Sequence, residues 1–433
     1  MKRSNWLLVA ALVGLAPGIL WDCADAFAQT IRLQAPADPA VDYTRLTRID
    51  TLVEQYVRSG WVRGVVTIIV KDNQLIQYKG YGYLDAESRK PMPSDALFRI
   101  ASQTKAIVSA GIMTLYEEGR FTLDEPISHF IPAFAHPRVL DKFSPGDTTY
   151  TTVPAKREIT FRDLLTHTSG LDYPLIGDKD MKAIYAKAGI SVGLDHFDMD
   201  LRERMEALAR LPLVHQPGEK WTYGLSVDVL GDLIEIMSGK DLQSFLSERI
   251  FRPLGMKDTY FNVPAAKAGR LAALYTEDSL HQVVLWKKEK TALDPDFDPE
   301  YPLLHKRYFS GGAGLTSTAY DYAVFLQMML NHGTYNHTQV LAPRTVELMT
   351  SEQLDSMFNG KDNFGLGFEI TSDRSAARQP KNAGSFSWGG YFGTTYWADP
   401  KDKLVCLIMT QQSPNSHGDL AGKFEQLVYQ SIR

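Results

Sequence analysis

Cysteine is nearly absent from the sequence, with only Cys23 and Cys406 in a chain of 433 residues. Cys23 lies in an N-terminal stretch that we expect to be removed, so the mature chain keeps one thiol and can form no internal disulfide. Cys406 lies within the apolar run KLVCLIM, where a structural thiol is usually inert. We therefore expect neither a disulfide framework nor a cysteine nucleophile.

Long runs of one charge are also absent. The 46 Lys and Arg residues stand against 51 Asp and Glu, a formal net charge of −5, and no long basic cluster predicts a nucleic-acid partner. The ten histidines show no H-E-x-x-H or similar spacing, so we predict no metal site. The glycine-rich SGGAGL, residues 310–315, lacks the lysine and the serine or threonine of a phosphate-binding loop. We expect no cofactor.

A long apolar run occurs at the N-terminus, where two basic residues precede WLLVAALVGLAPGIL and the small-residue sequence AFA ends at Ala28. This order predicts a secretory signal peptide over residues 1–28, cleaved after Ala28. The run is short and contains Pro17 and Gly18, which argues against a retained membrane helix. We therefore expect a periplasmic or secreted protein without a stable membrane span.

Strand patterns lie near both ends of the chain and helical patterns lie between them. The strand candidates are GVVTIIVKDNQLIQYKGYGYLD, with a hairpin turn at Asp72-Asn73, and FGLGFEI, SFSWGG, GTTYWAD and KLVCLIMTQ. The pattern predicts an α+β fold: an antiparallel sheet built from both termini and flanked by helices, over residues 29–119 and 306–433. A mainly helical domain, residues 120–305, is inserted, and the cleft between the two parts is the expected site.

The stretch RIASQTKAIVSAGIM places Ser102 and Lys105 at the start of a predicted helix, which runs from about Ser102 to Glu118. Residues three apart share a helix face, and a helix start favours an anion such as an attacked carbonyl oxygen. A lysine in a dry site can take the proton of a serine nucleophile. However, S-x-x-K occurs about once per chain by chance. An N-cap serine with a lysine that reaches solvent remains the alternative.

Three other segments are candidates. Tyr223 follows a Pro-Gly turn just before a predicted helix, where it could shuttle a proton or simply pack. Gly389 and Gly390, beside Trp388, could admit a ligand close to the strand or could form a bulge. The sequence GISVG, residues 189–193, matches G-x-S-x-G, but that motif needs a preceding strand and a following helix. The flanking sequences predict a helix before it and a loop after it, which disfavours its serine as nucleophile.

Taken together, the segments resemble the serine β-lactamase and penicillin-binding superfamily. The match is closest to the class C-like branch and, within it, to the family VIII carboxylesterases. The segments that carry the resemblance occur in the family's order: FRIASQTKAI, FTLDEPISHFIP, ITFRDLLTHTSGL, LPLVHQPGEKWTYGLSVDVLG, IFRPLGMKDTYF, FSGGAGLTSTAYDYAVFLQMMLN and SWGGYFG. The resemblance implies the β-lactamase fold, in agreement with the strand and helix layout.

The resemblance also implies roles for individual residues. Ser102 is similar to the family's nucleophile, Lys105 to its partner, and Tyr223 to the general base or proton relay. The backbone N–H groups of Ser102 and Tyr391 correspond to the oxyanion hole. The residues that the resemblance places against the substrate are Gln103, Trp388, Gly389 and Gly390.

Two departures from the β-lactamase pattern matter for the substrate. Tyr223-Gly224-Leu225 stands where Tyr-x-Asn is usual, and Trp388-Gly389-Gly390 stands where Lys-Thr-Gly is usual. The missing lysine and asparagine would have held the carboxylate and amide of a β-lactam, and tryptophan offers apolar area without charge. The resemblance therefore favours a carboxylesterase that acts on small ester substrates.

Other functions remain open from the sequence. The same serine could serve a β-lactamase, a D-amino-acid peptidase or an acyltransferase that uses an alcohol. A non-catalytic binding protein is a further alternative, disfavoured because the serine, lysine and tyrosine are all present. The acyl and alcohol preferences, the choice of Lys105 or Tyr223 as the initial base, and the oligomeric state stay undetermined.

Overall fold

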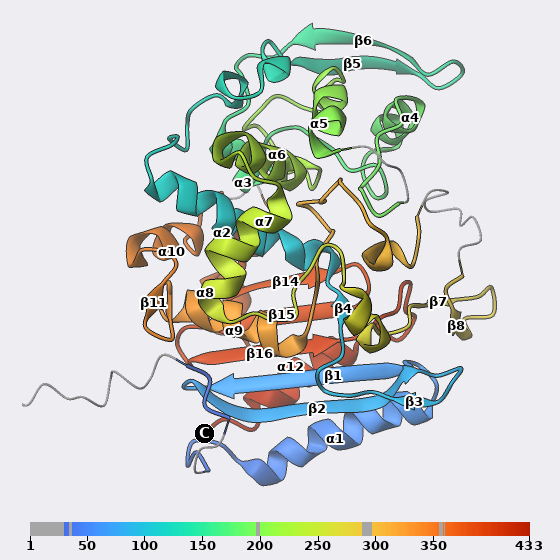
Figure 1. The fold of residues 1–433 in the computed structure, drawn as a ribbon, viewed down its shortest axis with the longest axis vertical. Helices are drawn as coiled ribbons and strands as arrows, with labels where there is room; N and C mark the ends of the chain where they lie inside the picture. The colour runs from blue at the N-terminus through green and yellow to red at the C-terminus, as the bar shows by residue number, and fades with distance from the viewer. Residues whose placement is uncertain (1–29, 34–36, 196–199, 288–296, 355–357, 359) are drawn as a thin grey trace, which may run out of the picture.

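The computed structural model describes residues 30–33, 37–195, 200–287, 297–354, 358 and 360–433 (Figure 1). The signal peptide predicted over residues 1–28 lies outside these residues, so its cleavage after Ala28 stays a prediction. Within the described part of the chain, no helix is both long enough and apolar enough to cross a bilayer.

The centre of the molecule is an eight-stranded antiparallel sheet with the order β12-β13-β14-β15-β16-β1-β2-β3. Three strands come from the N-terminal part: β1 (Gly64–Lys71), β2 (Gln74–Asp85) and β3 (Lys90–Pro91). Five come from the C-terminal part: β12 (Asn363–Phe364), β13 (Glu369–Ile370), β14 (Phe386–Gly390), β15 (Thr394–Asp399) and β16 (Leu404–Met409). Because β1 pairs with β16, the two ends of the chain share one sheet, and the predicted α+β fold is confirmed.

The central hairpin follows from its sequence. Every residue of β1 is buried, as expected for GVVTIIVK between two neighbouring strands and two helical layers. Asp72 and Asn73 connect β1 to β2 with φ angles of 51° and 58°. A two-residue hairpin turn of this kind needs positive φ at both positions, which Asp and Asn tolerate. The predicted hairpin turn is therefore confirmed.

Helices cover both faces of the sheet (Figure 1). On one face, α1 (Tyr43–Arg58) packs with α12 (Leu420–Tyr429), and their apolar side chains enclose Trp397 of β15. On the other face, α9 (Ala319–Leu330) contacts β1, β15 and β16. Thr318 caps α9 by accepting a hydrogen bond from the backbone N–H of Asp321 at 3.1 Å. Helix α2 (Thr104–Glu117) has side chains that are buried along most of its length.

The inserted part is mainly helical, as predicted. Its helices are α3 (Phe161–Leu165), α4 (Lys179–Lys187), α5 (Leu201–Ala209), α6 (Ser226–Ser238), α7 (Leu242–Leu246) and α8 (Arg252–Leu254). Two further helices follow in the C-terminal part: α10 (Pro343–Met349) and α11 (Asp373–Ala376). The division at residues 120 and 305 stays a prediction, because one apolar core includes side chains from both parts.

Two hairpins within the inserted part were not predicted. They pair β5 (Arg138–Ser144) with β6 (Thr149–Pro154), and β7 (Tyr275–Glu277) with β8 (Val283–Leu285). Most side chains of the first hairpin are exposed, so its sequence carries no alternation of apolar and polar residues that would mark a strand. Short hairpins that are held mainly by backbone hydrogen bonds cannot be recognised from the composition of their strands.

Candidate active site

Ser102 lies at the junction between a strand and the buried helix α2. Short strand β4 (Phe98–Arg99) pairs with β9 (Thr316–Ser317), and a single 3-10 turn then leads into α2. Ala101, directly before the serine, has φ of +43°, which is unusual for a residue with a Cβ. Ser102 was predicted as the first residue of the helix; it lies in the turn just before it. The helix ends at Glu117, and Gly119 follows its C-cap with φ of +70°.

Lys105 points back at Ser102 from the first turn of α2. Its Nζ lies 3.4 Å from Ser102 Oγ, and the side chain is only 2% exposed. The same Nζ donates a hydrogen bond to the carbonyl oxygen of Gly312 at 2.7 Å. The alternative of a lysine that reaches solvent is therefore wrong. Gly312 belongs to SGGAGL, and the function of this turn as an acceptor for Lys105 was not predicted.

A buried carboxylate completes the surroundings of the lysine. Asp228 of α6 is 1% exposed and accepts hydrogen bonds from Ser310 Oγ at 2.8 Å and from Tyr308 Oη at 3.2 Å. A Cβ built on Gly312 would lie 2.4 Å from Asp228 Oδ2 and 3.5 Å from Lys105 Nζ, so both charged groups approach the same glycine. Burial raises the pKa of Asp228, while the charge of Lys105 and the hydrogen bonds oppose that rise.

Asp228 was not predicted, although the sequence of α6 contains a signal for it. Most buried positions of the run SVDVLGDLIEIM are apolar, and Asp228 and Asp232 interrupt them. An acidic residue is almost never fully buried without a partner. Ser310 and Tyr308, which donate to Asp228, and Lys105, whose charge acts on it, lie in distant parts of the chain, so only the fold brings them together.

Tyr223 lies in the loop before α6 and is held by other aromatic rings. Its ring centroid lies 5.7 Å from that of Tyr173 and 5.6 Å from that of Trp388. Trp388 Nε1 donates a hydrogen bond to the Tyr223 hydroxyl at 3.4 Å. Lys105 Nζ lies 4.5 Å from the centroid of the Tyr223 ring. The serine, the lysine and the tyrosine singled out from the sequence are therefore brought together.

His167 packs behind Tyr223, with ring centroids 5.0 Å apart. Burial lowers the pKa of His167 well below its usual value, and the charge of Lys105 lowers it further, so the ring is neutral. The carbonyl oxygen of His167 accepts a hydrogen bond from the backbone N–H of Thr222 at 2.8 Å. His167 thus fixes the segment that carries Tyr223.

The end of β14 lies against the segment that leads to Ser102. A Cβ on Gly390 would lie only 2.4 Å from the carbonyl oxygen of Ile100 and 2.2 Å from Thr394 Oγ1, so this position requires glycine. Gly389 is less constrained, because the nearest atom to its added Cβ would be 3.5 Å away. Because the backbone at Gly390 lies close to the carbonyl of Ile100, Tyr391 and Ser102 line the same pocket. That the backbone N–H groups of Ser102 and Tyr391 form the oxyanion hole remains a prediction.

Two further residues considered from the sequence are Gln103 and Ser191. Gln103 is fully buried and, like Trp388, Gly389 and Gly390, is not among the described residues that line the pocket. Contact of these four residues with a substrate stays a prediction. Ser191, the serine of GISVG, lies in a loop after α4, with its Oγ 3.4 Å from the N–H of Gly193. It lacks the preceding strand that a nucleophile elbow needs.

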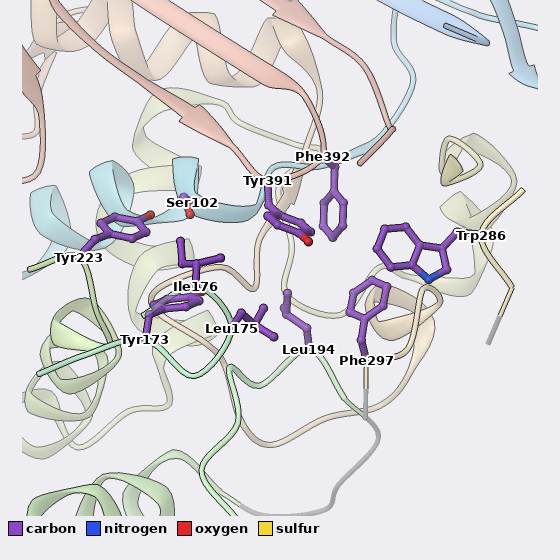
Figure 2. A pocket seen from close by; sticks show the side chains of 10 residues that line it. All are labelled: Ser102, Tyr173, Leu175, Ile176, Leu194, Tyr223, Trp286, Phe297, Tyr391 and Phe392. Carbon is purple, nitrogen blue, oxygen red and sulfur yellow. The ribbon is translucent and has the colours of Figure 1, made fainter. Parts of the chain in front are cut away.

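A pocket of about 520 Å³, counting space open to solvent, begins at Ser102 (Figure 2). None of its ten described lining residues carries a charge. They are Ser102, Tyr173, Leu175, Ile176, Leu194, Tyr223, Trp286, Phe297, Tyr391 and Phe392. Such a lining suits an uncharged substrate with apolar groups. Over the described ranges, no group of three or more His, Cys, Asp or Glu residues is placed to hold a metal ion.

The chain was compared with known proteins. It matches the Beta-lactamase family over residues 49–430. Protein Rv1367c of Mycobacterium tuberculosis (strain H37Rv) is 35% identical over 383 residues, which cover 85% of this chain and 90% of that protein. Esterase EstB of Burkholderia gladioli is 31% identical over 370 residues, which cover 84% of this chain and 89% of that protein.

Among solved structures, the chain is similar to EstCE1, described as a hydrolase with promiscuous acyltransferase activity. The two structures agree with a TM-score of 0.77 at 25% identity, over 90% of this chain and 99% of that chain. The resemblance inferred from the ordered sequence segments is confirmed. A match over most of the chain, in sequence and in fold, shows that this protein belongs to the Beta-lactamase family.

Proposed function

We propose that the protein is a carboxylesterase that cleaves uncharged esters through an acyl-enzyme on Ser102. The observation that carries this proposal is the 3.4 Å approach of Lys105 Nζ to Ser102 Oγ at the mouth of an uncharged, mainly apolar pocket. The likeness to esterase EstB and to the hydrolase EstCE1 supports the same reading.

The surroundings of Lys105 favour Tyr223 as the base. Lys105 Nζ donates to the carbonyl oxygen of Gly312 and lies beside Asp228, both of which stabilise an ammonium. A cationic lysine cannot accept a proton, but it stabilises a phenolate on the neighbouring tyrosine. In this mechanism, Lys105 stays charged and Tyr223 takes the proton of Ser102.

The reaction then proceeds in two halves. Ser102 Oγ bonds to the ester carbonyl carbon as its proton passes to the Tyr223 phenolate, and the backbone N–H groups of Ser102 and Tyr391 stabilise the oxyanion. The bond from carbon to the alcohol oxygen breaks as Tyr223 protonates the leaving alkoxide. Water next attacks the acyl-enzyme and gives its proton to Tyr223. The bond from carbon to Oγ breaks, Ser102 recovers the proton, and the carboxylic acid leaves.

Acyl transfer to an alcohol is the second candidate. It needs only that an alcohol replaces water in the second half, and the apolar lining of the pocket favours an organic acceptor over water. The likeness to EstCE1, a hydrolase with promiscuous acyltransferase activity, supports it. Addition of an alcohol to the ester assay, followed by identification of the products, separates transfer from hydrolysis.

The primary experiment compares the mature protein with Ser102→Ala on p-nitrophenyl butyrate and on a chromogenic cephalosporin. We expect fast ester hydrolysis that is lost in the variant, with little cephalosporin turnover, because none of the described residues that line the pocket carries a charge to hold a β-lactam carboxylate. Dominant cephalosporin turnover would contradict the proposal in favour of a β-lactamase. No turnover of either, with no labelling of Ser102 by a fluorophosphonate, would point to a binding protein.

A further inference from the structure

The pocket continues from Ser102 away from Tyr223. In Figure 2, Tyr223 lies on one side of Ser102, while Phe392, Phe297 and Trp286 lie beyond Tyr391 on the other side. The rings at this far end contact one another: the centroids of Trp286 and Phe297 are 5.0 Å apart, and those of Phe297 and Phe392 are 5.8 Å apart. We call the space lined by Leu194, Trp286, Phe297 and Phe392 the aromatic slot.

The walls of the aromatic slot are fixed to β4, the strand that leads to the nucleophile. The N–H of Asp298, next to Phe297, donates to the carbonyl oxygen of Leu194 at 3.0 Å. The buried guanidinium of Arg99, at the end of β4, donates to the carbonyl oxygen of Pro299 at 2.8 Å. Because β4 leads directly to Ser102, the distance between the slot and the serine is built into the fold. The slot is therefore a preformed site.

The positions of the catalytic groups leave one direction for the acyl chain. In the tetrahedral intermediate, the carbon bonded to Ser102 Oγ carries an oxyanion, the leaving oxygen and the acyl chain. The oxyanion must face the backbone N–H groups, and the leaving oxygen must face its proton donor, Tyr223. The acyl chain then points away from Tyr223, toward the aromatic slot.

We propose that the aromatic slot is the acyl-chain site and selects esters of apolar carboxylic acids, with the alcohol on the Tyr223 side. This inference rests on the proposed esterase function. Each methylene that the slot removes from water is expected to raise kcat/KM about fourfold, until the slot is filled. Charged or hydroxylated acyl groups are disfavoured, because the described residues that line the slot offer their polar atoms no charged partner in exchange for lost hydration.

The test uses two matched series of esters. The first keeps p-nitrophenol as the alcohol and lengthens the acyl chain from acetyl to decanoyl; the second keeps acetyl and lengthens the alcohol. Leu194→Phe narrows the slot, and Phe297→Ala enlarges it. Val284→Ala is the matched control, because Val284 lies in β8 near Trp286, is 37% exposed and does not line the pocket.

We expect Leu194→Phe to lower kcat/KM for octanoyl relative to acetyl esters at least tenfold, and Phe297→Ala to move the optimum to longer acyl chains. The alcohol series should keep its wild-type profile in both variants, and Val284→Ala should match the wild type in both series. If the alcohol profile changes instead, the slot holds the alcohol and the proposal is wrong. Equal loss across both series would also overturn it, because the substitutions would then act only on the fold.

A second measurement distinguishes failure of the slot from failure of the esterase function. p-Nitrophenyl alkylphosphonates place an alkyl group where the acyl chain would lie, and they label a nucleophilic serine without turnover. Labelling of Ser102, followed by mass spectrometry, should accelerate with alkyl length in the wild type and in Val284→Ala, but less in Leu194→Phe. A length-independent labelling rate would refute the slot alone, whereas no labelling at all would refute the proposed nucleophile. If Leu194→Phe does not fold, Phe297→Ala carries both measurements.

Discussion

The close approach of Gly390 to Ile100 lets us predict how a substitution at Gly390 would change the oxyanion hole. In Gly390→Ala, the new Cβ would lie 2.4 Å from the carbonyl oxygen of Ile100 and 2.2 Å from Thr394 Oγ1. The threonine hydroxyl can rotate away, but the Ile100 carbonyl is part of the backbone that leads to Ser102. A carbon and an oxygen atom that are not bonded need a separation of roughly 3 Å or slightly more. The end of β14 must therefore move away from Ile100 by about 1 Å.

That retreat moves the N–H of Tyr391, which follows Gly390, away from the position of the oxyanion. Loss of one oxyanion donor typically costs about 100-fold to 1,000-fold in kcat, and a misplacement of about 1 Å can cost about 100-fold. We therefore expect kcat for p-nitrophenyl butyrate to fall about 100-fold in Gly390→Ala, with a smaller change in KM. The melting temperature, measured in parallel, reports whether the variant is folded.

Gly389→Ala is the matched comparison. Its added Cβ would meet the carbonyl oxygen of Thr394 at 3.5 Å, an ordinary contact, so its loss of kcat should be far smaller. Adding Thr394→Ala to Gly390→Ala relieves the hydroxyl contact but not the backbone contact, and should not restore the rate. A Gly390→Ala enzyme within threefold of the wild type, or equal losses in the two glycine variants, would refute the reasoning.

Four further predictions follow from the site and its surroundings. Tyr223→Phe should lower kcat by about 100-fold or more, the scale of general acid–base catalysis, and a near-normal rate would remove Tyr223 from the mechanism. Asp228→Asn should lower kcat/KM at a fixed pH, because the carboxylate that lies beside Lys105 and accepts hydrogen bonds from Ser310 and Tyr308 is lost; an unchanged kcat/KM would contradict this. Burial raises the pKa of Glu235 to about 7, so the folded state binds a proton that the unfolded chain has released, and its contribution to stability falls as pH rises from about 4.5 to 7. Glu235→Gln should accordingly raise the melting temperature more at pH 8 than at pH 5, and an equal gain at both would show that desolvation of the carboxylate is not the cause. Finally, N-terminal sequencing of the protein exported by its native host should begin at Gln29, and an intact start would exclude the predicted cleavage.

Local patterns predicted the elements that depend on neighbouring residues. Ser102 and Lys105 are three residues apart, and Asp72-Asn73 is a turn within one hairpin, so both could be recognised from short stretches of sequence. The order of segments along the chain then placed Tyr223 with them, through the resemblance to a family. These predictions succeeded because each rests on spacing or order, which a sequence states directly.

The parts that were missed depend on contacts between distant segments. Gly312 meets Lys105 across 207 residues of sequence, and nothing local marks its carbonyl as an acceptor. Leu194 and Phe297 come from long segments without helical or strand periodicity, so their place in the pocket could not be derived. The burial of Gln103 could not be predicted for a different reason: its proximity to Ser102 in sequence does not decide which way its side chain points.

The pairing of β1 with β16 has a consequence for biosynthesis. Lys71 of β1 lies opposite Leu404 of β16, so the centre of the sheet cannot close until almost the whole chain has left the ribosome. Pairing between such distant segments is intrinsically slow, and until it forms the edge of β1 stays open to other chains. A nascent chain whose central sheet cannot form early stays unfolded. An unfolded chain is the form that can pass through a translocation channel. The same delay makes a prematurely terminated product that lacks β16 a candidate for aggregation and proteolysis.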